Sequence, residues 1–160
     1  SDGASACYIH GGQMDNLWAN DNLDLVPPAI DLIKKKGVPA GIAGHKPEVI
    51  LWGEENLDVD FYMCAYYNPS SRENIPDHRP DVNEYYGEED REKMIETIQK
   101  LSKPAIHYKI LAAGRNNPEA AFKKAGNAVR PQDAVCIGIF SGEDQDMLTK
   151  DVDLYKKYIE

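Results

Sequence analysis

Five segments of this chain share one pattern, in which a short run of strand-forming residues ends at a polar residue and a helix-like segment follows. The five runs cover residues 4–10, 38–45, 59–68, 104–109 and 134–141. Such alternation predicts repeated βα units and a parallel sheet. In sheets of this kind, the carboxyl ends of the strands and the loops after them form the ligand site. The pattern therefore predicts an α/β fold and the edge of the sheet at which a functional site would lie.

Length, charge and hydropathy exclude several classes of function. The 160 residues suit a single domain, residues 1–160, with a core of its own. A net charge of −9 without any basic cluster argues against a nucleic-acid partner. No apolar run approaches the roughly 20 residues that a membrane-spanning helix needs. Cys7, Cys64 and Cys136 fall in predicted strands and form no CxxC pair, which predicts buried, reduced thiols and favours a cytoplasmic compartment.

Prolines mark the starts of several expected helices, and one long polar segment interrupts the series. We expect helices over residues 25–36, 47–56, 88–101 and 145–159, and another that begins at Pro118 after the cap residue Asn117. Residues 69–87 are polar, hold three prolines and have no apolar periodicity. A loop of this length is a lid, a binding loop or a surface insertion. Because it follows a strand, we expect it to cover the site from above.

The two faces of the predicted strands differ in character. Side chains alternate between the faces along a strand, so each run divides into two sets. The first set is bulky and suits packing beneath helices: Cys7, Ile9, Ala40, Ile42, Phe61, Met63, Ala65, Ile106, Tyr108, Ile110, Val135, Ile137 and Ile139. The second set is smaller and becomes polar toward the strand ends: Ala6, Tyr8, His10, Gly41, Ala43, His45, Tyr62, Cys64, Tyr66, Asn68, Ala105, His107, Lys109, Ala134, Cys136, Gly138 and Phe140. An open doubly wound sheet is apolar on both faces, so the second set favours the interior of a (βα)8 barrel, with a flavodoxin-like open sheet as the alternative.

Three short motifs add to the barrel interpretation. They are His45-Lys46-Pro47-Glu48, Ala113-Gly114-Arg115 and Ile137-Gly138-Ile139-Phe140-Ser141. With these motifs, nearly the whole chain resembles the C-terminal five βα units of TIM-barrel enzymes of the aldolase and isomerase type. Because a complete barrel typically has about 250 residues, the resemblance implies about 90 to 120 further residues beside this chain. They would belong to a second chain that completes the barrel or to a second copy in a homo-oligomer.

Three histidines are the leading candidates for catalysis. His10 and His45 end their runs, and His107 lies just before the end of another. Neutral imidazoles that converge there could bind Zn²⁺, Mn²⁺ or Fe²⁺, or could act as general acids and bases near neutral pH. The alternative for each is a hydrogen-bonded core histidine. We expect His10, His45 and Lys109 to line one cavity, with His107 beside or just below them.

Cationic and hydrogen-bonding side chains are expected around these histidines. Lys109 would hold an anionic substrate, form a Schiff base or pair with a neighbouring carboxylate. Gly114 and Arg115 follow the fourth run and fit an anion-binding turn. Tyr66 and Asn68 would share the mouth of the site with Lys109.

These features favour an enzyme of the lyase or isomerase type that acts on a small anionic, carbohydrate-like substrate. The histidines would supply acid–base chemistry or hold a divalent metal cofactor, and a metal-dependent hydrolase is a related possibility. The alternative from another class is a non-catalytic TIM-barrel binding module or assembly subunit. Since the resemblance concerns architecture, the reaction is inferred by analogy from the fold.

Overall fold

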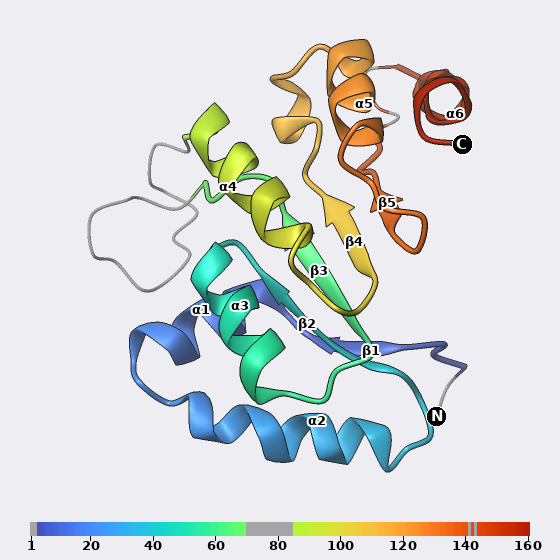
Figure 1. Cartoon of the computed structure of the whole chain (residues 1–160). Coiled ribbons are helices and arrows are strands. Elements are labelled where there is room, and N and C mark those ends of the chain that lie inside the picture. The colour runs from blue at the N-terminus through green and yellow to red at the C-terminus, as the bar shows by residue number, and fades with distance from the viewer. Residues whose placement is uncertain (1–2, 70–84, 141, 143) are drawn as a thin grey trace.

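The chain forms a five-stranded sheet in which all paired strands are parallel (Figure 1). The computed structural model describes residues 3–69, 85–140, 142 and 144–160. The strands are β1 (Cys7–Ile9), β2 (Ala40–Gly44), β3 (Phe61–Ala65), β4 (Ala105–Tyr108) and β5 (Ala134–Cys136). They lie side by side in the order in which they occur in the sequence. The α/β class and the alternation of strands with helices, both predicted from the sequence, are confirmed.

The helices begin where the sequence places prolines, acidic residues and cap residues. They are α1 (Gly11–Ala19), α2 (Val26–Lys34), α3 (Pro47–Asn56), α4 (Glu88–Ile98), α5 (Pro118–Gly126) and α6 (Met147–Tyr158), with short 3-10 turns η1 (Leu23–Leu25) and η2 (Ala112–Gly114). Proline lies in the first turn of α2, α3 and α5, where its missing N–H is not needed. The side chain of Asn117 caps α5 by accepting the Ala120 N–H at 3.0 Å. None of the described helices is long and apolar enough to cross a membrane.

Two local expectations differ from the structure at the carboxyl ends of the strands. The sequence predicts no helix at α1, yet this helix begins directly after His10. The strand-like runs also reach beyond the hydrogen-bonded strands, since the run over residues 134–141 contains only the three residues of β5. In both cases the chain leaves the sheet earlier than its β-forming residues suggest. For the first run the reason is that His10 caps α1 instead of continuing β1.

The cysteines differ in their exposure. Cys64 is buried, and burial raises the pKa of its thiol. Cys7 and Cys136 are exposed, so the expectation that all three thiols are buried is wrong. These two residues lie on β1 and β5, which are the outer strands of the described sheet.

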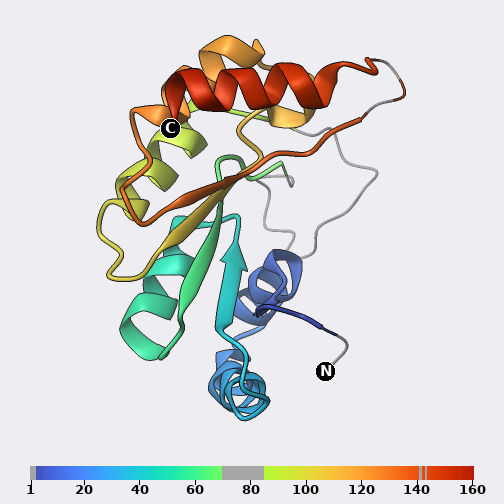
Figure 2. The same ribbon diagram turned by 90° about the vertical axis from the view of Figure 1, so that its right-hand side faces the viewer.

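One face of the three central strands is buried beneath helices. The apolar side chains that β2, β3 and β4 place on this face are at most 1 % exposed and belong to a single core: Ala40, Ile42, Tyr62, Cys64 and Ala105. Helix α3 lies directly on them, because a Cβ added at Gly53 would collide with Ile42. Figures 1 and 2 show α3 and α4 on the same side of the central strands. This layer of helices on strands forms the core of the protein.

The opposite face of the sheet is only partly covered. Most of its larger side chains are half-buried or exposed: Tyr8, Phe61, Met63, Ile106, Tyr108 and Cys136. Tyr8, on the outer strand β1, is 40 % exposed. Parallel sheets are usually covered on both faces, so the described residues leave an apolar sheet surface that is accessible. We refer to these six side chains as the open sheet face.

The strand register corrects the division of side chains made from the sequence. Ile42 of β2 pairs with Tyr62 of β3, and Tyr62 pairs with Ala105 of β4. Paired residues of parallel strands point to the same face, so His107 lies on the helix-covered face. Tyr108 lies on the open sheet face instead. Alternation defines the two sets within each strand, but it does not tell which set of one strand matches which set of the next.

Two aspartates define where neighbouring strands begin. Asp60, directly before β3, accepts the backbone N–H of Ala40 at the start of β2 at 2.8 Å. Asp133, directly before β5, accepts the backbone N–H of Ala105 at the start of β4, also at 2.8 Å. Asp133 further accepts two hydrogen bonds from the guanidinium group of Arg130, at 2.8 and 2.9 Å. Each aspartate thus ties its own strand to the first residue of the preceding strand.

We expect Asp133→Asn to destabilise the fold and to reduce its sensitivity to acid. Burial by itself raises the pKa of Asp133, but hydrogen bonds from Arg130 and from the backbone lower it to about 2. Since the unfolded chain has a value of about 3.9, the ionised carboxylate stabilises the fold above that pH, and this contribution is lost as the pH falls toward about 2. The substitution should lower the free energy of unfolding at neutral pH by about 3 kcal/mol, because it removes the buried carboxylate and leaves the half-buried Arg130 without its counter-ion. Urea denaturation at several pH values measures both effects.

Asp58→Asn is the matched control for this experiment. Asp58 forms a salt bridge with Lys34 at 2.6 Å, but its side chain is 85 % exposed. Exposed pairs contribute little to stability, so this variant should unfold close to the wild-type urea midpoint. Equal losses of stability in the two variants would contradict the role given to Asp133.

Candidate functional site

The carboxyl ends of β1, β2 and β4 bring together three side chains suited to moving a proton. His45 follows β2, Asp15 lies on α1 after β1, and Tyr108 is the last residue of β4. His45 Nδ1 lies 2.7 Å from Asp15 Oδ2, and His45 Nε2 lies 3.4 Å from the Tyr108 hydroxyl. We call Asp15, His45 and Tyr108 the Asp–His–Tyr cluster. Of the three candidate histidines, only His45 joins it.

Two members of this cluster are shielded from solvent. Asp15 is 6 % exposed and His45 is 7 % exposed. Burial raises the pKa of the Tyr108 phenol, which is therefore protonated at neutral pH. A carboxylate at Nδ1 favours the tautomer in which Nδ1–H donates to Asp15 and Nε2 accepts from Tyr108. The second carboxylate oxygen of Asp15, Oδ1, is buried and has no hydrogen-bond partner among the described residues.

The first residues of α1 position Asp15 against His45. His10 is the N-cap of α1, and its Nδ1 accepts a backbone N–H two residues on, at 3.2 Å. Gly11 and Asp15 are four residues apart and share one face of the helix. A Cβ at Gly11 would lie 3.0 Å from His45 Cε1 and 3.3 Å from the Tyr108 hydroxyl. Glycine at this position therefore lets the start of α1 approach the imidazole closely.

His107 belongs to a separate network within the core. Its Nδ1 lies 3.0 Å from the Tyr66 hydroxyl, and its Nε2 lies 3.2 Å from Asp133 Oδ2. Burial lowers the pKa of His107, although the hydrogen bond to Asp133 opposes this effect. The expectation that His107 lies beside His10, His45 and Lys109 is wrong, because the register places it on the helix-covered face. Tyr66, expected at the mouth of the site, instead directs its hydroxyl to this buried imidazole.

The three histidines do not form a metal site. Within residues 3–69, 85–140, 142 and 144–160, no group of three or more His, Cys, Asp or Glu side chains could hold a metal ion. His10 is exposed at the start of α1, and His45 is hydrogen-bonded to Asp15. His107 lies on the other face of the sheet. The expectation that His10, His45 and His107 bind one Zn²⁺, Mn²⁺ or Fe²⁺ ion together is therefore not met.

The turn after β4 has an unusual backbone and carries two of the predicted cations. Lys109 directly follows Tyr108, and the guanidinium group of Arg115 lies 4.5 Å from the centre of the Tyr86 ring. Residues with L side chains in the left-handed region cost roughly 1–2 kcal/mol each, and such strain clusters at functional sites. The positive φ angles are 62° at Lys109, 49° at Ala112, 52° at Ala113 and 81° at Gly114. This turn is thus a strained segment next to the Asp–His–Tyr cluster along the chain.

Asn68 and the long loop were expected at the mouth of the site. The Asn68 backbone N–H donates to Asp90 at 3.4 Å, and its side-chain Oδ1 is buried with no hydrogen-bond partner in the described part of the chain. Of the loop over residues 69–87, residues 70–84 lie outside the described residues. Near its end, the Tyr86 ring packs against that of Tyr67, with centroids 5.6 Å apart. That this loop covers the site stays a prediction.

Sequence reasoning missed two members of the cluster. Asp15 was missed because α1 was not predicted, although Met14, Leu17 and Trp18 have the apolar spacing of a helix. Tyr108 was assigned to the helix-packed set, because the relative phase of the strands was unknown. The helical spacing was therefore an available signal, whereas the position of Tyr108 required the register.

We expect Asp15→Asn to change the tautomer of His45. With the Asp15 carboxylate 2.7 Å from Nδ1, we expect the wild-type imidazole to carry its proton on Nδ1 and to donate it to Asp15. An asparagine can present its amide N–H to Nδ1, which favours the tautomer with the proton on Nε2. The ¹⁵N chemical shifts of the imidazole distinguish the two tautomers. The control is Glu48→Gln, which makes the same acid-to-amide change at an exposed position three residues after His45 and should leave its tautomer unchanged. If Asp15→Asn also leaves the His45 tautomer unchanged, the assignment is wrong.

Gly11→Ala and Gly12→Ala form a matched pair that tests the close approach of α1. Alanine is favoured over glycine within a helix by up to about 1 kcal/mol. The Cβ added at Gly12 meets His10 Nδ1 at an ordinary 3.4 Å, whereas the Cβ added at Gly11 crowds His45 at 3.0 Å. Gly11→Ala should therefore have the lower thermal midpoint of the two and should shift the imidazole signals of His45. Identical midpoints and spectra for the two variants would show that the approach is not tight.

Comparisons with known proteins identify no relative of this chain. No model of a protein family matches it, and no curated protein and no solved structure matches it. The function is therefore argued from the geometry of the site.

Proposed function

We propose that this protein is an enzyme of the lyase or isomerase type that acts on a small anionic, carbohydrate-like substrate. Proton transfer would be carried out by the Asp–His–Tyr cluster. The observation that carries the proposal is the hydrogen-bonded sequence from Asp15 through His45 to Tyr108 at the carboxyl ends of the strands. Ligand sites of parallel α/β proteins lie at this edge of the sheet.

The cluster can pass a proton in either direction. As a substrate C–H proton moves to the Tyr108 oxygen, the phenolic proton moves to His45 Nε2. The imidazolium that results is stabilised by the carboxylate of Asp15, 2.7 Å away. Return of the proton to a neighbouring atom of the substrate completes an isomerisation. Departure of a leaving group from the carbanion, with the proton given to that group, completes a lyase reaction.

The turn after β4 supports an anionic substrate. Lys109 is the next residue after Tyr108, and Arg115 lies at the end of the same turn. A lysine holds an anion as a point charge, and an arginine holds a carboxylate or phosphate through two parallel hydrogen bonds. Gly114, with φ of 81°, provides a position in the turn without a side chain. These residues would orient the substrate while the Asp–His–Tyr cluster acts on it.

We also propose that the five βα units are part of a (βα)8 barrel. The consecutive strand order and the helix layer on one face support a barrel, since a flavodoxin-like sheet has the order 2-1-3-4-5 with helices on both faces. The open sheet face, which includes Tyr108, would then be the barrel interior. Further βα units, from a second chain or a second copy, would pair with the edges of β1 and β5. The Asp–His–Tyr cluster would lie at the mouth of the completed barrel.

A non-catalytic binding or assembly module is the second candidate. The observation that favours it is the 7 % exposure of His45, whose two ring nitrogens both have protein partners. Such an imidazole is also typical of a hydrogen-bonded core histidine. In that case the same carboxyl edge would bind an anion without turning it over.

Exchange of substrate hydrogens with solvent distinguishes the two candidates. The protein is incubated in D₂O with a panel of hydroxy-ketones, hydroxy-acids and their phosphate esters, and deuterium incorporation is followed by ¹H NMR. For a substrate that exchanges, Tyr108→Phe and His45→Gln should each slow the exchange by roughly 10²- to 10⁴-fold, the usual contribution of a general acid–base group. Tyr155→Phe makes the same change on the surface of α6 and should leave the rate unchanged. Binding without exchange, or exchange that both variants retain, would exclude the proposed reaction.

A further inference from the structure

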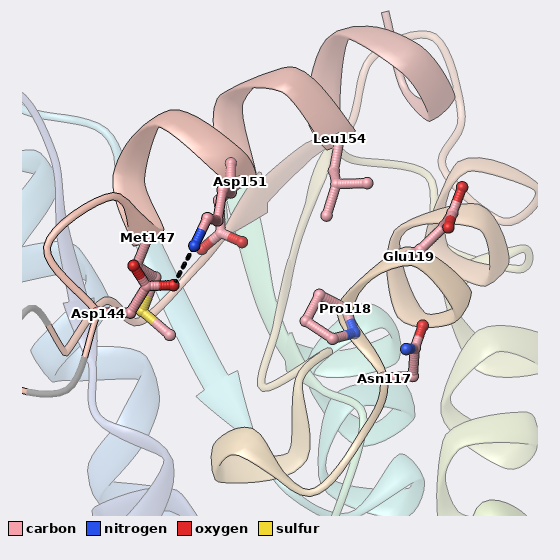
Figure 3. Close-up of a pocket in the computed structure, with 8 residues that line it drawn as sticks. Asn117, Pro118, Glu119, Asp144, Met147, Asp151 and Leu154 are labelled. Carbon is pink, nitrogen blue, oxygen red and sulfur yellow. Dashed lines mark hydrogen bonds and ion pairs between the residues drawn. The ribbon is translucent and has the colours of Figure 1, made fainter.

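A second concave site lies away from the Asp–His–Tyr cluster, between the start of α5 and the first turns of α6 (Figure 3). The cavity has a volume of about 280 Å³. Pro118, Met147 and Leu154 give it apolar walls, and Asp151 on α6 lines it as well. Figure 3 shows the Asp151 carboxylate directed from α6 toward the space between these walls. Neither the fold nor the proposed reaction uses this carboxylate.

Of the three carboxylates that line the cavity, only Asp151 has no counter-ion among the described residues. Asp144 forms a salt bridge with Lys150 at 2.6 Å. Glu119 forms one with Lys157 at 2.7 Å. Asp151 is 7 % exposed, and its Oδ2 is buried with no hydrogen-bond partner in the part of the chain that the structure describes. A buried carboxylate without a partner is costly, and a cationic ligand would remove that cost.

The start of α5 gives little support to an anionic ligand at this place. Pro118 has no N–H, and the N–H groups of Ala120 and Ala121 donate to the side chain and the carbonyl of Asn117. The usual anion site at a helix N-terminus is therefore largely occupied by the protein itself. Charge and hydrogen bonding both favour a ligand that donates hydrogen bonds and carries a positive charge.

We propose that this cavity binds a primary alkylammonium group. The ammonium group would donate hydrogen bonds to Asp151, and its hydrocarbon chain would lie between Pro118, Met147 and Leu154. A free aliphatic amine and the lysine side chain of a partner protein both present this chemistry. The site is built from α5 and α6, so it does not depend on the reaction proposed for the Asp–His–Tyr cluster.

A titration of the whole ¹⁵N-labelled chain with n-butylammonium tests the proposal. Amide signals of α5 and α6 should shift and saturate at millimolar concentrations, as expected for a small ligand with one charge-assisted contact. n-Butanol has the same chain without the charge and butyrate has the opposite charge, so neither should saturate in this range. Equal responses to n-butylammonium and n-butanol would overturn the proposal.

Two acid-to-amide variants on α6 separate the proposed contact from the general charge of the helix. Asp151→Asn should weaken n-butylammonium binding at least about tenfold, because it removes a charge-assisted hydrogen bond. Asp153→Asn removes the same charge from an exposed position on the same helix and should leave the affinity nearly unchanged. Met147→Ala, which removes an apolar wall, should weaken n-butylammonium more than methylammonium. Equal affinities of the two acid-to-amide variants would overturn the proposal.

The pH and a second ligand complete the test. Burial raises the pKa of Asp151, and the nearby Asp144 adds to this effect. Binding of n-butylammonium should therefore weaken as the pH falls through this raised pKa. The other charged groups that face the cavity are Asp144, Glu119 and Lys150. An affinity for n-butylammonium that does not change with pH would contradict the role of Asp151.

A second ligand, Nα-acetyl-lysine methylamide, distinguishes the two sources of the ammonium group. If it binds at least as tightly as n-butylammonium, the site is assigned to a lysine side chain, and weaker binding assigns the site to a free amine.

Discussion

The carboxylate of Asp133 is the interaction on which the C-terminal part of the sheet depends. It accepts hydrogen bonds from the first N–H of β4 and from the guanidinium group of Arg130. His107 Nε2 also lies within hydrogen-bond distance of it. Because β5 has only three residues and is largely exposed, apolar burial alone would define its position poorly. The same carboxylate also affects the candidate site. The imidazole of His107 is held by Asp133 and Tyr66 within the core and is not available at the other face, so the proposed acid–base chemistry relies on His45.

Much of the fold could be predicted because its signals are local. The helix expected over residues 47–56 is the helix found, since a proline and an acidic residue define its first turn. The five strands were also found in their five runs. Helix α1 was not predicted, because its two starting glycines resemble a turn and its cap is a histidine. The division into faces failed between strands, since the phase of one strand relative to the next is fixed by pairing over long separations in the sequence.

The candidate site was less predictable than the fold for the same reason. His10, His45 and His107 look alike in the sequence, as each lies near the end of a strand-like run. In the structure, His10 caps a helix, His45 pairs with a carboxylate and His107 is buried in the core. Their partners come from distant parts of the chain, since Asp15 is 30 residues from His45 and Tyr108 is 63 residues from it. A strand pattern identifies the edge where such residues gather, and only tertiary packing determines which of them meet.

The consecutive strand order has a consequence for how the sheet is assembled during synthesis. Each strand from β2 onward pairs with the strand made immediately before it, so a newly made βα unit finds its partner already formed. Contacts between successive units close short loops, which favours fast folding. Domains can fold in this way from the N-terminal end while the chain is still growing. By the same logic, β5 and α6 join after β1 to β4 have formed, and Asp133, directly before β5, then binds the first N–H of β4 through the Ala105 amide.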